Sequence, residues 1–267
     1  MARKKGELIA LGGTAEVFTW GDNQVLKLLL EEMPYSDAEN EARATDAAQK
    51  VGLPVPAVEG IIEVEGRTGI VFERVEGRSM LSEMMSRPWK IVRFARMLAE
   101  LQYKLHSRDV TELAPLREQL QQKIHEAEGL PEKTREAVLK ILQQLPGGNS
   151  FCHGDFHPGN ILMSPHGPVI IDLIDATRGN PLGDVARTSL LLRLPGMPPG
   201  YRGGRLIDFL RRRFHAAYLR HYLKLCQHSR EELDAWLPVV AAARLEEQSI
   251  PEFQRPVLLA LVEKSVV

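Results

Sequence analysis

The order of hydrophobic patterns along the chain restricts its fold more than any other feature. Up to about residue 75, short runs rich in Val, Leu and aromatic residues are separated by turn residues. From Ser79 onward, apolar residues recur mainly at helical spacing. Strands first and helices later predict an α+β fold, in which a small sheet lobe is joined to a larger helical lobe.

The first part is expected to contain three strands, a helix and two more strands. The predicted helix carries Ala and Glu throughout, with Ser36 or Asp37 as its N-cap and Gly52 at its C-terminal end. A turn at Gly66 joins the last two strands. The predicted strands are ELIAL, EVFTW, QVLKLLL, GIIEVEG and RTGIVFERV.

The second part is mainly helical, with two interruptions. One is the polar stretch FCHGDFHPGNIL, and the other is PVIIDLIDA, whose Val and Ile run predicts a short buried strand. Glycine and proline make residues 195–204 the one segment that we expect to be flexible. Helical spacing covers residues 82–107, 112–128, 132–145, 204–228 and 230–262.

Composition limits the classes of protein that the chain can belong to. Of its 267 residues, 44% are hydrophobic and 26% are charged, so disordered and fibrous classes are excluded. The formal charge of −1 gives no reason to expect nucleic acid or a membrane surface as a partner. Monomer and dimer both stay open.

The expected location is the cytoplasm. Cys152 and Cys226 are too few for a disulfide framework and fit a reducing compartment. The apolar run Leu8 to Leu11 is shorter than the core of a signal peptide, and no segment approaches the ~18 apolar residues that span a bilayer.

The stretch FCHGDFHPGNIL allows two kinds of chemistry. His153 and Asp155 have the H-x-D spacing of non-haem iron oxygenases, and a third ligand could come from His215, His221 or His228. Such a triad needs an all-β scaffold, whereas the residues after 204 have helical spacing. Pro158 and Gly159 also prevent the two histidines of the stretch from sharing a helix face as zinc ligands do. The iron oxygenase therefore stays a remote alternative.

Phosphoryl transfer needs a base, oxygen ligands for Mg²⁺ and a lysine for the phosphates. Asp155 is the candidate base. Asn160 and Asp172 are the candidate metal ligands, because amide and carboxylate oxygens suit Mg²⁺ and Asp172 directly follows the buried PVII strand. The sequence thus offers a complete set of groups for phosphoryl transfer.

Lys27 is the candidate lysine, and it lies in the apolar strand QVLKLLL. A buried lysine needs a carboxylate partner, and Glu41 of the following helix is the candidate. The alternative is that Lys27 faces solvent on an edge strand. Gly12 and Gly13 would let the first hairpin approach phosphates, although a plain hairpin turn explains them as well.

Five segments make the sequence similar to the aminoglycoside phosphotransferase family, which includes choline-kinase-like enzymes and resembles the protein kinases in fold. In the resemblance, Asp155 takes the catalytic position, Asn160 and Asp172 the metal positions and Asp184 the structural aspartate of the next helix. Leu173 departs from the family, which usually has Trp there, and the first loop is poor in glycine. The segments are HGDFHPGN, IIDLIDATRGNPLGDVA, EARATDAAQKVGLPVPAV, FERVEGRSM and LAELQYKLHS.

The resemblance implies a two-lobed protein-kinase-like fold, with an N-terminal lobe over residues 1–76, a helical lobe over 77–267 and a hinge at 72–78. It implies Mg²⁺ and a nucleotide donor, either ATP or GTP. The backbone of Glu73 and Val75 would meet the adenine. The residues expected around the nucleotide are Gly12, Gly13, Thr14, Val17, Lys27, Glu41, Glu73 and Val75.

The predicted activity is transfer of the γ-phosphoryl group to a hydroxyl of a small molecule. A nucleotide-binding pseudokinase and a protein-substrate kinase stay as alternatives. The basic run 209–225 is either a solvated helix face or part of the cleft, and in the second case an anionic or neutral acceptor is favoured. Acidic residues follow from Glu231 to Glu252, so a cationic acceptor is not excluded.

Overall fold

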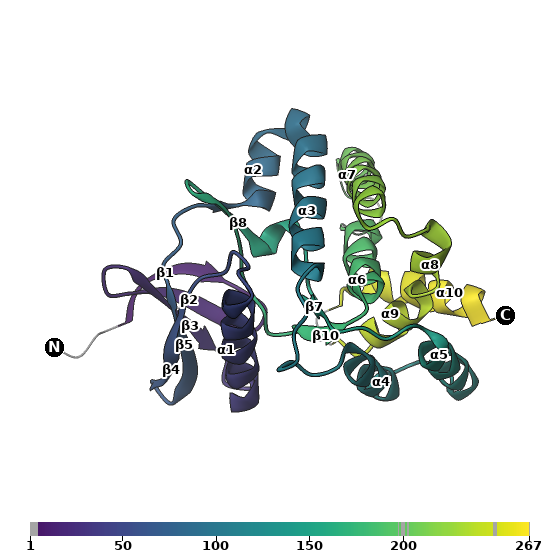
Figure 1. Ribbon diagram of the computed structural model, residues 1–267, viewed down its shortest axis with the longest axis horizontal. Helices are drawn as coiled ribbons and strands as arrows, with labels where there is room; N and C mark the ends of the chain where they lie inside the picture. The colour runs from purple at the N-terminus through teal and green to yellow at the C-terminus, as the bar shows by residue number, and fades with distance from the viewer. Residues whose placement is uncertain (1–4, 197, 199–200, 202, 248–249, 267) are drawn as a thin grey trace. The chain divides into compact units, whose positions relative to one another are not determined.

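The contacts of the chain divide it into two compact units. The first unit contains residues 1–83 and 158–176, and the second unit contains residues 84–157 and 177–267. The predicted α+β class is confirmed, because the first unit holds a five-stranded sheet and the second is mainly helical (Figure 1). The lobe boundary at residues 76 and 77 stays a prediction. The structure, a computed structural model, describes residues 5–196, 198, 201, 203–247 and 250–266.

An antiparallel sheet with the strand order β1-β2-β3-β5-β4 forms the first unit's core (Figure 1). Its strands are the five that the hydrophobic runs predict. Side chains of β2, β3 and β5 pack on both faces, whereas those of β1 after Lys5 are exposed. Leu29 and Ile70 pack with Ala38 of α1 on one face, whereas Leu26 and Val71 pack on the other. The elements are β1 (Lys5–Leu11), β2 (Ala15–Trp20), β3 (Gln24–Leu29), α1 (Tyr35–Lys50), β4 (Val58–Val64) and β5 (Arg67–Glu73).

The start of α1 differs from the prediction. Its N-cap is Pro34, with an extended backbone and no side-chain cap, so the expectation of Ser36 or Asp37 at this position is wrong. The ring of Pro34 already holds φ at −69°, and the helix therefore begins at the next residue. Asp37 lies in the first turn instead, where its negative charge stabilises the positive end of the helix dipole.

The two predicted glycine turns are confirmed. Gly52 follows α1 with a φ of +75°, the left-handed conformation that commonly ends a helix. Glu65 and Gly66 join β4 to β5, and both have positive φ, as a tight two-residue hairpin turn of this hand requires.

A small three-stranded sheet completes the first unit and joins distant parts of the sequence. Its order is β6-β8-β9, and the backbone N–H of Ile170 donates to the carbonyl of Pro54 at 2.7 Å. The predicted strand at PVIIDLIDA is confirmed as a shorter strand, although only Ile170 of it is buried. β6 and β8 were not predicted. The strands are β6 (Arg78–Ser79), β8 (Ile161–Ser164) and β9 (Gly167–Ile170), and a single 3₁₀ turn at Pro158–Asn160 precedes β8.

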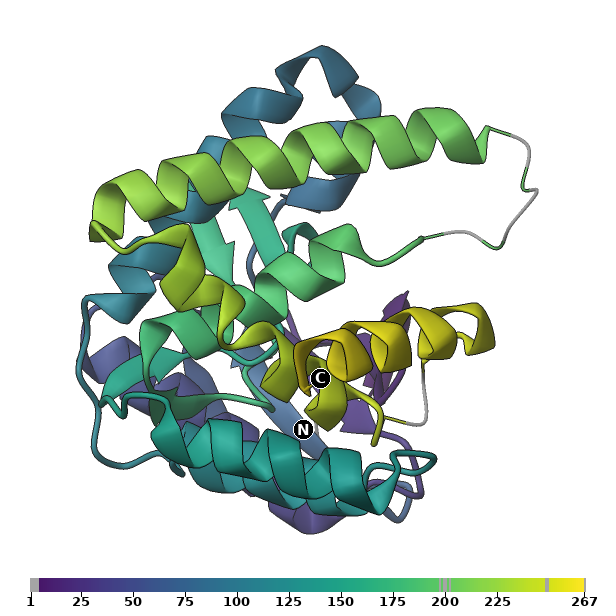
Figure 2. The ribbon, with the colours of Figure 1, turned by 90° about the vertical axis from the view of Figure 1, so that its right-hand side faces the viewer.

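Helices make up most of the second unit. The 23-residue helix α7 packs along α3, and α4 packs beside α5 (Figure 2). A two-stranded pair, β7 (Ser150–Cys152) with β10 (Thr177–Gly179), lies among them. The helices after residue 79 are α2 (Met80–Ser86), α3 (Ile91–His106), α4 (Leu116–Glu126), α5 (Glu132–Gln144), α6 (Pro181–Arg193), α7 (Gly204–Cys226), α8 (Arg230–Asp234), α9 (Leu237–Arg244) and α10 (Arg255–Val266).

Prolines divide two of the predicted helical stretches. Pro88 begins a 3₁₀ turn between α2 and α3. The described part of the stretch 230–262 is divided among α8, α9 and α10. Pro238 lies in the first turn of α9, and Pro251 is the N-cap of a further 3₁₀ turn. Residues 197, 199, 200 and 202 of the segment 195–204 lie outside the described residues, so the flexibility of that segment stays a prediction.

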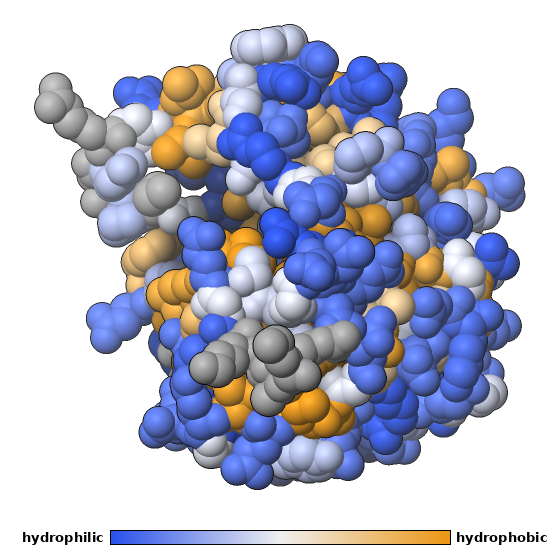
Figure 3. All heavy atoms as spheres, turned by 90° about the vertical axis from the view of Figure 1, so that its left-hand side faces the viewer, coloured by the Kyte–Doolittle hydropathy of each residue, from blue (hydrophilic) through white to orange (hydrophobic). Residues whose placement is uncertain are grey.

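Within the described part of the chain, no helix combines the length and the apolar composition needed to cross a bilayer. Figure 3 shows one face of the molecule, on which hydrophilic residues predominate and apolar residues form separate small groups.

Candidate active site

The register of the sheet decides which way Lys27 points. In β3, Leu26 and Leu28 pack on the face away from α1, so Lys27 lies on the face that α1 covers. Its Nζ donates to both carboxylate oxygens of Glu41 at 2.8 Å and to Oδ1 of Asp172 at 2.6 Å. The solvent-facing alternative for Lys27 is therefore wrong, and the predicted Lys27–Glu41 pair is present.

This cluster of charges is largely shielded from water. The side chains of Lys27 and Glu41 are 12% and 2% exposed, and that of Asp172 is 35% exposed. Burial alone would lower the pKa of Lys27, but the charges of Glu41 and Asp172 outweigh it and raise the pKa above its ordinary value. Lys27 consequently stays a cation throughout the neutral range.

Asp172 and Asn160 are brought together by the β8–β9 hairpin. Ile161 pairs with Ile170, and the backbone N–H of Ile171 donates to the carbonyl of Asn160 at 3.0 Å, so the two candidate ligands lie at the same end of the hairpin. Asp172 has a φ of +67°, which is uncommon for residues other than glycine. Such backbone strain is found most often at functional positions.

A cavity of about 470 Å³ lies in the first unit, which is within the range of small-molecule sites. It is lined by the β1–β2 loop, β3, α1, the segment after β5 and the β8–β9 hairpin. Every residue of this unit that was predicted to bind nucleotide or metal lines the cavity. The roles of these residues stay predictions. These residues are Gly12, Gly13, Thr14, Val17, Lys27, Glu41, Glu73, Val75, Asn160 and Asp172.

The glycine pair of the first loop leaves space beside this cavity. The N–H of Gly12 donates to the carbonyl of Ala15 at 2.8 Å, which closes the turn. Neither Gly12 nor Gly13 has a positive φ, and a Cβ added to Gly13 would meet no atom within 4 Å. The fold itself therefore does not require glycine at residue 13.

Several apolar residues of the cavity besides Val17 and Val75 were not predicted. Val25 and Phe72 line it from the sheet, and Leu162 and Ile170 line it from the hairpin. Ile9 and Leu11 also line it although their side chains are exposed. The signal in the sequence was weak, because the same residues fit an ordinary strand pattern.

Asp155 belongs to the second unit, and its carboxylate lies beside a histidine and an arginine. His157 Nε2 lies 3.3 Å from Oδ2 and Arg187 Nη2 lies 3.7 Å from Oδ1. Burial alone would raise the pKa of Asp155, but the hydrogen bond and charge of His157, with the charges of Arg187 and His153, hold it below its ordinary value. Asp155 is therefore ionised at neutral pH and can accept a proton.

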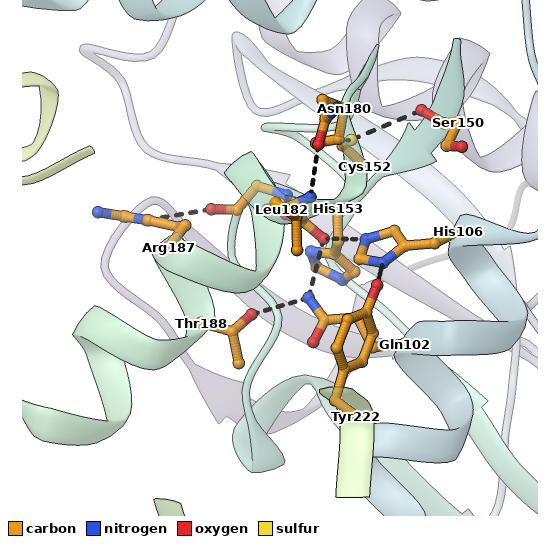
Figure 4. A network of polar contacts seen from close by, with 12 residues as sticks. Gln102, His106, Ser150, Cys152, His153, Asn180, Leu182, Arg187, Thr188 and Tyr222 are labelled. Carbon is orange, nitrogen blue, oxygen red and sulfur yellow. Dashed lines mark hydrogen bonds and ion pairs between the residues drawn. The ribbon is translucent and has the colours of Figure 1, made fainter. Parts of the chain in front are cut away.

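A buried polar network supports the loop that carries Asp155 (Figure 4). Oδ1 of Asp184 accepts from the N–H of Gly154 at 2.7 Å, and its Oδ2 contacts Gln102 Nε2 and His106 Nε2, each at 3.0 Å. Tyr222 Oη lies 2.6 Å from the other ring nitrogen of His106. Burial alone would raise the pKa of Asp184. The hydrogen bond and charge of His106, together with the hydrogen bond from Gln102, outweigh this effect and lower the pKa to about 2.

The two histidines of FCHGDFHPGNIL contact Asp155, which lies in the same loop. His153 is fully buried, its Nδ1 accepts from the N–H of Asp155 at 3.2 Å, and its ring packs edge-on against Phe156. Among the described residues, no group of three or more His, Cys, Asp or Glu side chains is arranged to hold a metal ion. The helical second unit also lacks the β scaffold that the iron oxygenase alternative needs, so nothing in the described chain supports it.

The basic run of α7 is mostly a solvated face. Arg212, Arg213, Arg220 and Lys224 are exposed. Arg211 is half-buried, and its Nη2 donates to the carbonyls of Leu191 and Leu192 at 3.1 and 3.4 Å, at the end of α6.

Three residues near Asp155 were missed by the sequence reasoning: Arg187, Arg244 and Glu247. Glu247 bridges the two arginines, with distances of 2.6 Å to Arg187 Nη2 and 3.1 Å to Arg244 Nη1. The spacing of Asp184 and Arg187, three residues apart on one helix, could have indicated a shared face, but nothing in the sequence linked them to residues sixty positions later.

Comparisons with known proteins identify the family of the chain and agree with its fold. A family model described as "Phosphotransferase enzyme family" matches residues 7–236. No curated protein sequence matches the chain.

Several solved structures are similar in fold. A thermostable mutant of aminoglycoside phosphotransferase APH(4)-Ia, in a ternary complex with ADP and hygromycin B, has a TM-score of 0.69 at 15% identity, covering 99% of this chain and 94% of that one. Aminoglycoside-3'-phosphotransferase of type VIII has a TM-score of 0.62 at 22% identity, covering 91% and 93%. Amicoumacin kinase hAmiN, with AMP-PNP, Ca²⁺ and Ami, has a TM-score of 0.63 at 13% identity, covering 98% and 87%. The predicted kinase-like fold is confirmed.

Proposed function

Because the chain belongs to the phosphotransferase enzyme family and is a kinase with an alcohol group as acceptor, we propose that it transfers the γ-phosphoryl group of ATP to a hydroxyl of a small molecule with the help of Mg²⁺. The observation that carries this proposal is the Lys27 ammonium held between Glu41 and Asp172 at the wall of the 470 Å³ cavity. A buried cation beside a cavity, fixed by two carboxylates, is suited to hold phosphate groups.

The residues present fit a magnesium nucleotide. Asn160 and Asp172 offer an amide oxygen and a carboxylate at one end of a hairpin, which are ligands that Mg²⁺ prefers. When bound, Mg²⁺ would neutralise charge on the phosphates. Apolar residues such as Val25 and Phe72 suit a purine ring, and this lining suits ATP and GTP alike.

In the proposed reaction, Asp155 orients the acceptor hydroxyl and takes its proton. The hydroxyl oxygen forms a bond to the γ-phosphorus, the bond from that phosphorus to the β–γ bridging oxygen breaks, and ADP leaves. Ionised Asp155 suits this role, because only the carboxylate form can accept the proton. Lys27 would hold the phosphates while the first unit binds the nucleotide.

The acceptor is expected to be a small hydroxylated molecule. The similar structures include a kinase of aminoglycosides and one of amicoumacin, which supports a small acceptor rather than a protein. We also place the enzyme in the cytoplasm, where ATP is available and where its two free thiols fit.

The test is ADP release from Mg·ATP and Mg·GTP in the presence of aminoglycosides, amicoumacin, neutral polyols, hydroxy acids and model proteins. One class of small hydroxylated acceptor should accelerate ADP release. In Asp155→Asn, calorimetry should show unchanged Mg·ATP affinity, while transfer falls by roughly 10² to 10⁴. Tight Mg·ATP binding without turnover of any acceptor would support the pseudokinase alternative, and unchanged turnover in Asp155→Asn would reject the assigned base.

A further inference from the structure

Helix α6 holds both peptide groups that flank Gly154, the residue before the proposed base. Asp184 and Arg187 lie three residues apart, so they share a face of the helix. Asp184 accepts from the N–H of Gly154 at 2.7 Å, and Arg187 Nε donates to the carbonyl of Gly154 at 3.1 Å (Figure 4). Gly154 has a φ of +83°, so the contacts from α6 hold a turn that few other residues could form.

The other end of the Arg187 guanidinium contacts two carboxylates. Nη2 lies 2.6 Å from Oε1 of Glu247 and 3.7 Å from Oδ1 of Asp155. Arg187 thus contacts the backbone before the base and the carboxylate of the base with one rigid, planar group. A lysine offers no such fork, because its ammonium is a single point charge.

Arg187 is itself held in place. Glu247 uses its second oxygen to accept from Arg244 Nη1 at 3.1 Å, so one carboxylate joins arginines from α6 and from the last turn of α9. The side chains of Arg187, Arg244 and Glu247 are 13%, 11% and 19% exposed. Charged contacts that are shielded from water to this degree have well-defined geometry and are screened little by salt.

Charged and titratable groups from at least three segments of the described chain act on Asp155. Its own loop provides His153 and His157, α6 provides Arg187, and the end of α9 provides Arg244. Arg187 contacts the carbonyl of Gly154 in addition to its ion pairs.

We infer that Arg187 is a positioning residue for the proposed phosphoryl transfer: it holds the Asp155 carboxylate oriented toward the acceptor hydroxyl, while Glu247 and Arg244 fix the guanidinium. The inference rests on the proposed role of Asp155 as the base. It assigns to the last turn of α9 and the residues after it a function in catalysis, although they lie beyond the residues matched by the family model.

The first measurement does not depend on turnover. In the full-length protein labelled with ¹³C at aspartate, the Asp155 carboxyl signal, identified by its loss in Asp155→Asn, is titrated by NMR. Arg187→Met should raise the titration midpoint of Asp155 by about one pH unit or more, because a nearby positive charge has been removed. Arg187→Lys should restore part of this difference.

The second measurement uses the first acceptor found in the ADP-release panel. Arg187→Met should lower kcat about 10- to 100-fold, as misplacement of a reacting group does, with KM for Mg·ATP changed less than about twofold. The acid limb of the kcat profile should move to higher pH. Glu247→Gln, which keeps the shape of the side chain, should show the same changes to a smaller extent.

Arg135 provides a matched control. It is 14% exposed, pairs with Glu132 at 3.2 Å and donates to the carbonyls of His125 and Ala127, where it holds the turn between α4 and α5. Arg135→Met should lose stability comparably but keep the Asp155 midpoint, kcat and the pH profile of the wild type.

The possible results separate the inference from the proposed function. If Arg187→Met and Glu247→Gln behave like Arg135→Met in both measurements, the inference is wrong. If no acceptor is phosphorylated but the Asp155 midpoint still rises in Arg187→Met, the effect of Arg187 on Asp155 stands and the proposed function fails. Should Arg187→Met not fold, Arg187→Lys and Glu247→Gln decide the question.

Discussion

Lys27 illustrates how one residue links folding to function. Its ammonium lies between Glu41 and Asp172, and Glu41 is almost completely buried. A buried carboxylate without its cation is costly, so the lysine is needed for the fold as well as for phosphate binding.

We expect Lys27→Met to lower the free energy of unfolding by roughly 3–5 kcal/mol, because Glu41 loses its cation. Mg·ATP affinity should fall as well. Urea denaturation and calorimetry measure the two effects. The double variant Lys27→Met/Glu41→Gln is the control, since it removes both charges and should recover part of the stability. Equal losses in the single and double variants would contradict the buried-pair account.

Asp184 gives a prediction about pH. Its pKa in the folded protein is about 2, below its ordinary value, so the carboxylate stabilises the fold fully above about pH 4 and loses this effect as pH falls toward 2. The lowering corresponds to roughly 2 kcal/mol. Between pH 5 and pH 2, the stability difference between wild type and Asp184→Asn should shrink by about this amount in denaturant titrations. A pH-independent difference would show that the network does not favour the charged form.

At the scale of elements, the short strands β6, β8 and β9 place the candidate metal ligands. Their sheet was missed by pattern analysis because strands of two to four residues carry too little periodicity. Gly77 just precedes β6, and a Cβ at this residue would lie 2.5 Å from the carbonyl oxygen of Met163 in β8. This contact requires glycine, whereas Gly13 borders open space.

Gly77→Ala should therefore destabilise the protein by roughly 1–3 kcal/mol, since its φ of +151° and the clash both disfavour a side chain. Gly13→Ala is the matched control and should leave the unfolding midpoint unchanged. Thermal or urea unfolding of both variants compares them directly. Equal midpoints would mean that β6 and β8 do not approach each other as closely as described.

At the scale of the whole molecule, the proposal assigns nucleotide binding to the first unit. Mg·AMP-PNP at 100 times its Kd should raise the free energy of unfolding by about 2.7 kcal/mol. Hydrogen exchange should slow at residues 9–15, 73–77, 159–160 and 170–173, which line the cavity. Asp155→Asn should show the same protection, and EDTA should reduce it. Protection confined to the second unit would contradict the assignment.

The compact units also show how sequence order and spatial order differ. The first unit takes in residues 158–176, because β8 pairs with β6 and Ile170 bonds to Pro54, more than a hundred residues earlier. Patterns of hydrophobicity report on neighbours along the chain, so such long-range pairing is invisible to them.

Much of the protein could be predicted from its sequence alone. Alternating and helical spacing identified the five strands of the main sheet and most helices, because burial of one face imposes a local period. The motif HGDFHPGN and its partners identified the family, and the candidates Lys27, Glu41, Asn160 and Asp172 all line one cavity.

Only the tertiary structure decided the surroundings of those residues. It decided that Lys27 faces α1 rather than solvent, that most of the basic run of α7 is solvated, and that Arg187, Glu247 and Arg244 meet beside Asp155. The physical reason is that a contact between side chains depends on register, helix rotation and distant packing. These are set by the whole fold, whereas strand and helix periods are set by a few consecutive residues.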